Sequence, residues 1–194
     1  MTPARLIVEG VSGAGKSRVL RLLRRRPEFR GALVLTERET FGELMSEPLD
    51  RPAFLRRLTA CLERLARLPA GRACLVERFH PSYHALVPDW ALYAPFDRRL
   101  KRLGFKLAVL RVPEAALARR SLDRTDRSPR WRAGMRAYFG GRGQALKALK
   151  TSQRRRLAAA RRTTLACRIC DAREGEWTRL AAEMAEFARG GRPR

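Results

Sequence analysis

A glycine-rich octapeptide near the start of the chain combines residue types that bind phosphate groups. Residues 10–17 have the sequence GVSGAGKS, which fits the pattern G-x-x-x-x-G-K-[ST]. In this pattern the glycines let backbone N–H groups turn toward the phosphates, the lysine reaches the β and γ oxygens, and the serine hydroxyl ligates Mg²⁺. We therefore predict a nucleotide site. The predicted binding residues are Gly10, Ser12, Gly13, Ala14, Gly15, Lys16 and Ser17.

Charged residues directly after two other apolar segments are further candidates. Glu37 follows the apolar residues 32–36, and Glu77 and Arg78 end the segment that begins at residue 73. Parallel sheets place ligands at the carboxyl ends of their strands, and phosphoryl transfer needs cations and a group that orients the attacking oxygen. We therefore expect these three residues to lie beside the phosphates. Glu39 and Glu43 are alternative candidates for the base.

The order of apolar and helical segments predicts how these residues are held. Apolar runs at residues 4–9, 32–36, 73–77, 105–112 and 165–171 predict strands, and helical patterns alternate with them. Residues 16–26 form the helix after the octapeptide, while residues 37–43 are expected to be a loop. The pattern predicts an α/β fold with three layers, in which helices flank a parallel sheet of about five strands. We expect a single domain spanning residues 1–194.

The amino-acid composition limits the kinds of molecule that the protein is expected to bind. The formal net charge is +24, from 43 lysines and arginines against 19 acidic residues, so an anionic partner is expected. The basic run at residues 142–162 is either a solvated helix face or a surface for a polynucleotide backbone; we favour the first because no aromatic residues interleave. No apolar run approaches the roughly 20 residues of a membrane span, so we expect a cytoplasmic protein without a membrane partner.

The cysteines and histidines, which are residue types that can ligate a metal, are here interpreted as structural. Cys167 and Cys170 lie in a predicted strand, which would point their thiols to opposite faces and disfavours a shared metal. His80 and His84 are four residues apart near a strand end, but a metal site would need a third ligand. We expect two packed or exposed histidines.

The sequence resembles the deoxynucleoside kinase and thymidylate kinase group of P-loop kinases. Residues 8–10 (VEG) leading into residues 13–17 (GAGKS) are similar to the opening of that group, residues 36–37 (TE) and 77–79 (ERF) resemble two further motifs, and residues 120–127 fit the spacing of its arginine-rich lid. The sequence departs from the group where Arg38 follows Glu37 in place of proline. A P-loop motor is disfavoured because the apolar segments at residues 73–77 and 105–112 do not end in a Walker B aspartate.

The resemblance implies a role for each residue. Glu37 accepts the proton of the sugar hydroxyl, Arg78 holds the acceptor and the phosphate, and Glu77 lies with Ser17 near Mg²⁺. A lid at about residues 120–130 closes over the transferring phosphate. The predicted catalytic residues are Lys16, Glu37, Arg78, Arg120, Arg124 and Arg127.

Together these observations predict a kinase that uses ATP and Mg²⁺ and phosphorylates a nucleoside- or nucleotide-like small molecule. Any nucleic-acid binding is then weak, non-specific and a by-product of charge. Alternatives are a kinase of a non-nucleoside alcohol or of a polynucleotide 5′ end, and a nucleotide-dependent regulator that binds nucleic acid. The sequence does not predict an oligomeric state.

Overall fold

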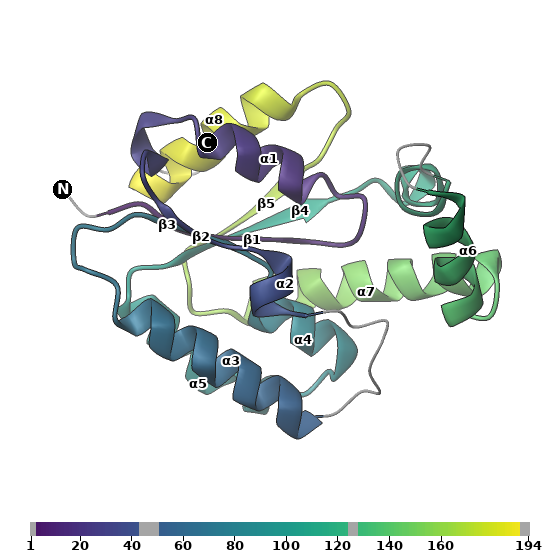
Figure 1. Ribbon diagram of the computed structural model, residues 1–194, viewed down its shortest axis with the longest axis horizontal. Helices are drawn as coiled ribbons and strands as arrows, with labels where there is room; N and C mark the ends of the chain where they lie inside the picture. The colour runs from purple at the N-terminus through teal and green to yellow at the C-terminus, as the bar shows by residue number, and fades with distance from the viewer. Residues whose placement is uncertain (1–2, 43–50, 124–127, 191–194) are drawn as a thin grey trace.

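In the computed structural model, which describes residues 3–42, 51–123 and 128–190, five strands form one parallel sheet (Figure 1). Across the sheet their order is β2-β3-β1-β4-β5, so β1 pairs with β3 on one side and β4 on the other. This confirms the predicted fold class. The strands are β1 (Arg5–Gly10), β2 (Leu33–Leu35), β3 (Cys74–Glu77), β4 (Lys106–Arg111) and β5 (Cys167–Asp171).

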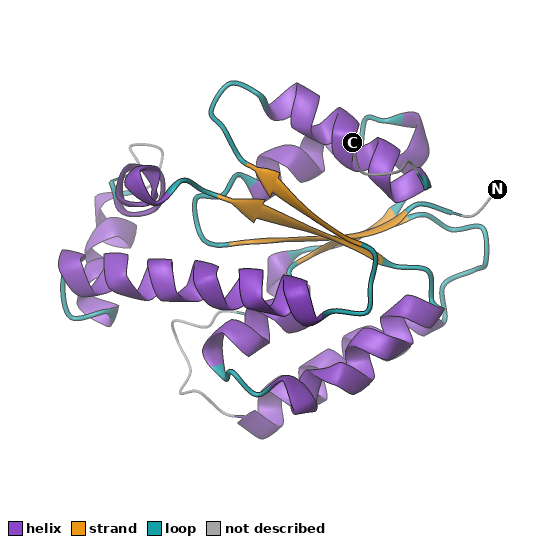
Figure 2. Cartoon of the chain, turned by 180° about the vertical axis from the view of Figure 1, so that it is seen from behind, coloured by secondary structure: helices purple, strands orange, loops and turns teal. Residues whose placement is uncertain are grey.

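Helices cover both faces of the sheet, as Figures 1 and 2 show from opposite sides. One face carries α1 (Lys16–Leu23) and α8 (Trp177–Arg189); the other carries α3 (Arg51–Ala66), α4 (His80–Leu86), α5 (Trp90–Arg102) and α7 (Arg142–Arg162). Successive strand residues enter different cores: Cys170 packs on the α1 side and Cys167 on the α5 side. The prediction that these thiols point to opposite faces is therefore confirmed.

Glycines and turns divide the predicted helices more finely than the sequence pattern indicates. Gly140 and Gly141, where φ is 73° and 114°, separate α6 (Pro129–Tyr138) from α7. After β4 the chain forms a 3₁₀ turn, η2 (Glu114–Ala116), and a π-helical turn, η3 (Ala118–Leu122). A further 3₁₀ turn, η1 (Pro27–Phe29), follows α1.

A short helix replaces part of the loop predicted at residues 37–43, where that prediction is wrong. α2 (Glu37–Thr40) begins at the end of β2 because Thr36 and Glu39 form a capping box, with 2.8 Å between Thr36 N and Glu39 Oε2. Arg64 also donates to Glu39 at 2.8 Å, so the carboxylate of Glu39 is bound by structural partners. The other alternative base, Glu43, lies outside the described residues.

No helix in the described part of the chain is both long and apolar enough to cross a membrane.

Candidate active site

The phosphate-binding loop connects β1 to α1 at the carboxyl end of the sheet. Gly13 and Gly15 adopt φ values of 77° and 90°, which side chains rarely tolerate. A Cβ atom on Gly13 would lie 2.2 Å from the carbonyl oxygen of Arg120, and one on Gly15 would lie 2.3 Å from the ring of Trp177. Both the backbone conformation and the close neighbours therefore require glycine. Ser121 fixes the loop from η3 by donating from Oγ to the Ser12 carbonyl at 2.6 Å.

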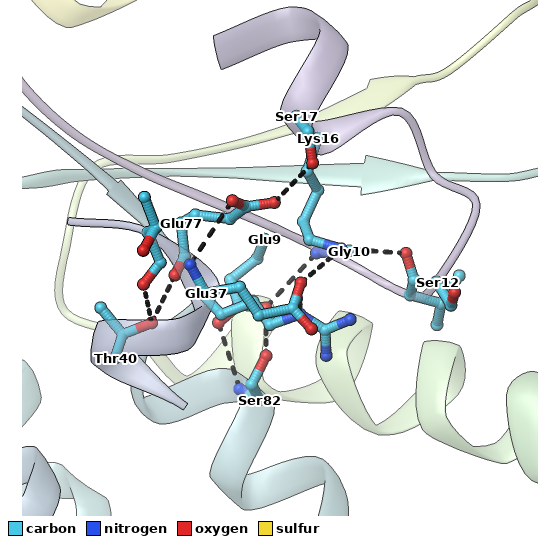
Figure 3. Close-up of polar contacts among 12 residues, drawn as sticks. Glu9, Gly10, Ser12, Lys16, Ser17, Glu37, Thr40, Glu77 and Ser82 are labelled. Carbon is cyan, nitrogen blue, oxygen red and sulfur yellow. Dashed lines mark hydrogen bonds and ion pairs between the residues drawn. The ribbon is translucent and has the colours of Figure 1, made fainter. Parts of the chain in front are cut away.

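Three predicted catalytic residues meet beside this loop, and Figure 3 labels two of them, Lys16 and Glu37. The Glu37 Oε2 atom lies 2.9 Å from Arg78 Nε and 3.8 Å from Lys16 Nζ. Lys16 also donates to the Val11 carbonyl at 3.3 Å. Among the described residues, Arg78 is the one non-glycine residue with positive φ, at 60°, which is a strained conformation typical of functional sites. The Glu37 carboxylate thus bridges the P-loop cation Lys16 and Arg78, which directly follows β3.

Burial and charge shift the titration of these groups. Burial, followed by repulsion from Arg78, lowers the pKa of Lys16 to about 7. Burial acts to raise the pKa of Glu37, but the charges of Arg78 and Lys16 outweigh it and hold that pKa below its usual range. Glu37 is therefore ionised at neutral pH, while Lys16 is near its midpoint when no phosphate is bound.

The two residues predicted to lie near Mg²⁺, Ser17 and Glu77, also lie together. Ser17 Oγ donates to Glu77 Oε1 at 3.1 Å, and the second carboxylate oxygen of Glu77 is 3.5 Å from the backbone nitrogen of Glu37. Thr40 steadies the end of β3 by donating from Oγ1 to the Glu77 carbonyl at 2.6 Å. One hydroxyl and one carboxylate are the hard oxygen donors that Mg²⁺ prefers, and they leave further positions to phosphate oxygens and water. These residues therefore fit the ion.

Arg156 of α7 is a component of the site that sequence reasoning missed. It is 3% exposed, and its Nε lies 3.3 Å from Glu9 Oε2. Burial and repulsion from Arg78 lower the pKa of Arg156 to about 10, and its charge also acts on Lys16 and Glu37. Interpreting all of residues 142–162 as a solvated face or a polynucleotide surface is therefore wrong at Arg156.

A periodic signal could have revealed this. Ala145, Leu149, Gln153 and Arg156 follow one another at intervals of four, four and three residues, so they share one face of a helix, and all four are buried. The neighbouring cations have other partners: Arg154 pairs with Glu114 and Arg155 donates to a backbone carbonyl.

Glu9 connects Arg156 to the start of α4. Its carboxylate accepts hydrogen bonds from Phe79 N at 2.7 Å, from Ser82 N at 3.2 Å and from Ser82 Oγ at 2.7 Å. These bonds satisfy a buried carboxylate and hold α4 directly after β3. Glu9 and Arg156 therefore fix the backbone from which Arg78 projects.

Arg120 lies on the opposite side of the P-loop from Glu37, against Trp177. Its guanidinium donates to the Ala172 carbonyl and stands 5.2 Å from the centre of the Trp177 ring; Arg18 stands 5.8 Å from the same centre. In this state the structure therefore places Arg120 apart from the Glu37 cluster. Arg124 and Arg127 lie outside the described residues.

A pocket of about 390 Å³ adjoins Trp177. Its lining comes from α1 and from the segment that opens α8, so it lies beside the helix that starts at the P-loop. The lining residues are Arg18, Arg21, Leu22, Arg25, Glu174, Gly175, Trp177 and Thr178.

The two histidines after β3 are both packed. His80 Nε2 lies 3.0 Å from Asp97 Oδ1, and the rings of His80 and His84 contact Trp90. Burial, followed by the charge of Arg162, lowers the pKa of His84. Within the described ranges, no three His, Cys, Asp or Glu side chains are grouped as ligands for a metal ion.

The fold matches those of three solved structures over almost the whole chain. A gluconokinase from Sinorhizobium meliloti 1021 aligns with a TM-score of 0.60 and 23% identity, covering 97% of this chain and 95% of that one. YorR from Bacillus subtilis, solved in complex with phosphorylated GDP, aligns with a TM-score of 0.59 and 13% identity, covering 95% of each chain. Deoxyadenosine kinase from M. mycoides with bound dATP aligns with a TM-score of 0.55 and 13% identity, covering 96% of this chain and 100% of that one.

These likenesses establish the fold that the sequence predicted. No protein-family model matches the chain, and no curated protein matches its sequence. The function must therefore be inferred from the site.

Proposed function

We propose that this protein is an ATP- and Mg²⁺-dependent phosphotransferase that moves the γ-phosphoryl group to a nucleoside- or nucleotide-like small molecule. The observation that carries the proposal is the Glu37 carboxylate, which lies 3.8 Å from Lys16 of the P-loop and 2.9 Å from Arg78. An ionised carboxylate next to the transferring phosphate can orient an acceptor hydroxyl and accept its proton. A site that only bound nucleotide would need no such group.

In this proposal the cations hold and neutralise the phosphates. Lys16 exchanges its contact with Glu37 for phosphate oxygens, while Arg78 keeps Glu37 in place and faces the transferring group. Arg120, Arg124 and Arg127 are assigned to the lid. Ser17, Glu77 and the phosphate oxygens would hold Mg²⁺, which would supply further charge neutralisation.

The two sides of the P-loop suggest where donor and acceptor bind. The donor base is assigned to the pocket beside α1, whose lining includes Trp177 and Arg18. The acceptor then approaches from the Glu37 side. The bound nucleotides named for YorR and for deoxyadenosine kinase are consistent with a nucleotide site in this fold.

A panel of acceptors tests the proposal. The protein is incubated with γ-labelled ATP, Mg²⁺ and separate nucleosides, nucleoside monophosphates, sugar acids and 5′-hydroxyl oligonucleotides. We expect label to move to a nucleoside or nucleotide. Label on a sugar acid or an oligonucleotide instead would support one of the other kinase alternatives, whereas ATP hydrolysis that needs nucleic acid and labels no acceptor would support the regulator.

A further inference from the structure

The excess positive charge is not distributed evenly over the protein. Many surface arginines are neutralised locally, as in the pairs of Arg111 with Asp171, Arg119 with Glu174, and Arg179 with Glu176. The run that the sequence suggested for a polynucleotide is also partly neutralised, because Lys150 and Arg154 share Glu114 and Arg156 is buried. Positive charges without an acidic partner therefore lie elsewhere on the surface.

Eight exposed cations lie in three segments at the amino end of the sheet. We call them the amino-edge cations. Among the described residues, none of these eight side chains forms an ion pair, and residues 67–72, 98–105 and 158–166 contain no acidic residue. The amino-edge cations are Arg67, Arg72, Arg98, Arg99, Lys101, Arg102, Arg161 and Arg162.

Buried contacts hold the three segments side by side. From the start of β1, Arg5 donates to the carbonyl oxygens of Pro69 and Leu103, both at 2.9 Å, and so joins the segment after α3 to the end of α5. Asp97 accepts from Thr164 N at 2.7 Å and so joins α5 to the end of α7. Arg98 directly follows Asp97, and Arg162 precedes the threonine pair.

This edge is far from the candidate active site along the strands. The P-loop follows the carboxyl end of β1, whereas Arg5 begins that strand. In Figure 1 the C-terminal end of α3 lies toward the left of the view, whereas α2 and α6 lie further to the right. A ligand at the amino edge would therefore leave the P-loop accessible.

We propose that the amino-edge cations bind the phosphate backbone of double-stranded nucleic acid. Seven of the eight are arginines, whose guanidinium groups can form two hydrogen bonds to one phosphate. No described segment of the edge exposes an aromatic side chain on which unpaired bases could stack, which favours a duplex over a single strand. A membrane is disfavoured because Tyr138 and Ile169, the exposed large hydrophobic side chains of the described residues, lie outside these segments.

Two matched variants of the full chain test the proposal. The edge variant carries Arg99→Gln, Arg102→Gln and Arg162→Gln; the control carries Arg111→Gln, Arg154→Gln and Arg179→Gln, which are exposed and ion-paired. Both lose three positive charges. The measurement is binding of a fluorescent 20-base-pair DNA duplex across a series of salt concentrations, with thermal melting to verify folding.

We expect the wild type to bind with affinity that falls steeply with salt. The edge variant should bind at least about tenfold more weakly near 100 mM salt, with a log–log slope shallower by about two to three. The control should stay close to the wild type. Equal losses in both variants would mean that net charge alone drives binding, and an unchanged edge variant, or equally tight binding to vesicles of anionic lipid, would also overturn the proposal.

Lysine labelling tests the location in the wild-type protein. The chain has lysines only at positions 16, 101, 106, 147 and 150, so acetylation can be assigned position by position with mass spectrometry. Bound duplex should protect Lys101 while Lys147, exposed on α7, reacts as before. Protection of Lys147 with Lys101 still reactive would move the interface to α7 and refute the amino-edge assignment.

Discussion

Cations gather at both ends of the sheet, but in opposite environments. At the carboxyl end, Lys16, Arg78 and Arg156 are each less than 10% exposed, and each lies near a carboxylate. At the amino end, the amino-edge cations are exposed and lack acidic partners in the described structure. A buried charge loses its hydration and needs a partner, whereas an exposed one keeps its water. The carboxyl end is thus organised before a ligand arrives, and the amino end depends on solvent until one does.

The largest expected effect follows from removing the P-loop cation. Lys16→Ala should reduce phosphoryl transfer by at least about a thousandfold. The reason is that Lys16, which contacts the P-loop backbone at Val11, is the residue proposed to neutralise the transferring phosphate. Lys147→Ala, which removes an exposed lysine from α7, should leave turnover unchanged. The measurement is kcat with the acceptor identified in the panel. Near wild-type turnover of folded Lys16→Ala would show that the P-loop is not the reaction site.

The second effect concerns the carboxylate between the cations. Glu37→Gln should lower kcat by roughly 10²–10⁴-fold with a smaller effect on ATP binding, because it removes proton acceptance but keeps the shape. Glu39→Gln provides the matched control, since Glu39 caps α2 and contacts Arg64. If Glu77→Gln stops turnover at saturating Mg²⁺ while Glu37→Gln does not, the acceptor approaches from β3.

The third effect separates two arginines of one helix. Arg156→Ala should destabilise the protein by about 3–5 kcal/mol, because it leaves the buried Glu9 without its charged partner. Arg161→Ala on the exposed end of α7 should change the free energy of unfolding by less than about 0.5 kcal/mol. Urea denaturation measures both. A loss below about 1 kcal/mol in Arg156→Ala would mean that Glu9 is satisfied by its backbone and serine donors alone.

Part of the candidate active site could be predicted from the sequence. The P-loop was predictable because its glycines, lysine and serine are adjacent in sequence and each type is required by local backbone or phosphate geometry. Glu37 and Arg78 were predictable from their positions after apolar strands, and the structure places Glu37 beside both Lys16 and Arg78. These predictions rested on local order.

The remaining features depend on contacts between distant segments. Arg156 lies 147 residues after Glu9, and a run of charged residues hides its place on the buried face of α7. Thr36 and Glu39 could have suggested the start of α2 through their capping spacing, but the amino-edge cations come from three separate segments. Only the packing of Arg5 and Asp97 reveals that these segments meet.

The smallest expected effect is a difference in pH dependence between nucleotide binding at the carboxyl end of the sheet and duplex binding at the amino end. Burial lowers the pKa of Lys16 to about 7 in the absence of phosphate, and a bound triphosphate should raise that pKa by attraction. Nucleotide binding above pH 7 should therefore take up a proton, so affinity is fully present below pH 7 and falls as pH rises, by up to about tenfold per pH unit between pH 7.5 and 9.5.

Calorimetry without Mg²⁺, in two buffers with different ionisation enthalpies, measures both the affinity and the proton uptake. We expect uptake to approach one proton at pH 8.5 and to be small at pH 6. Duplex binding at the amino edge should change little over pH 7.5–9.5, because arginine guanidinium groups stay protonated in proteins. Constant ATP affinity without proton uptake would show that Lys16 remains charged when free, whereas a parallel loss of duplex affinity would remove the proposed difference between buried and exposed cations.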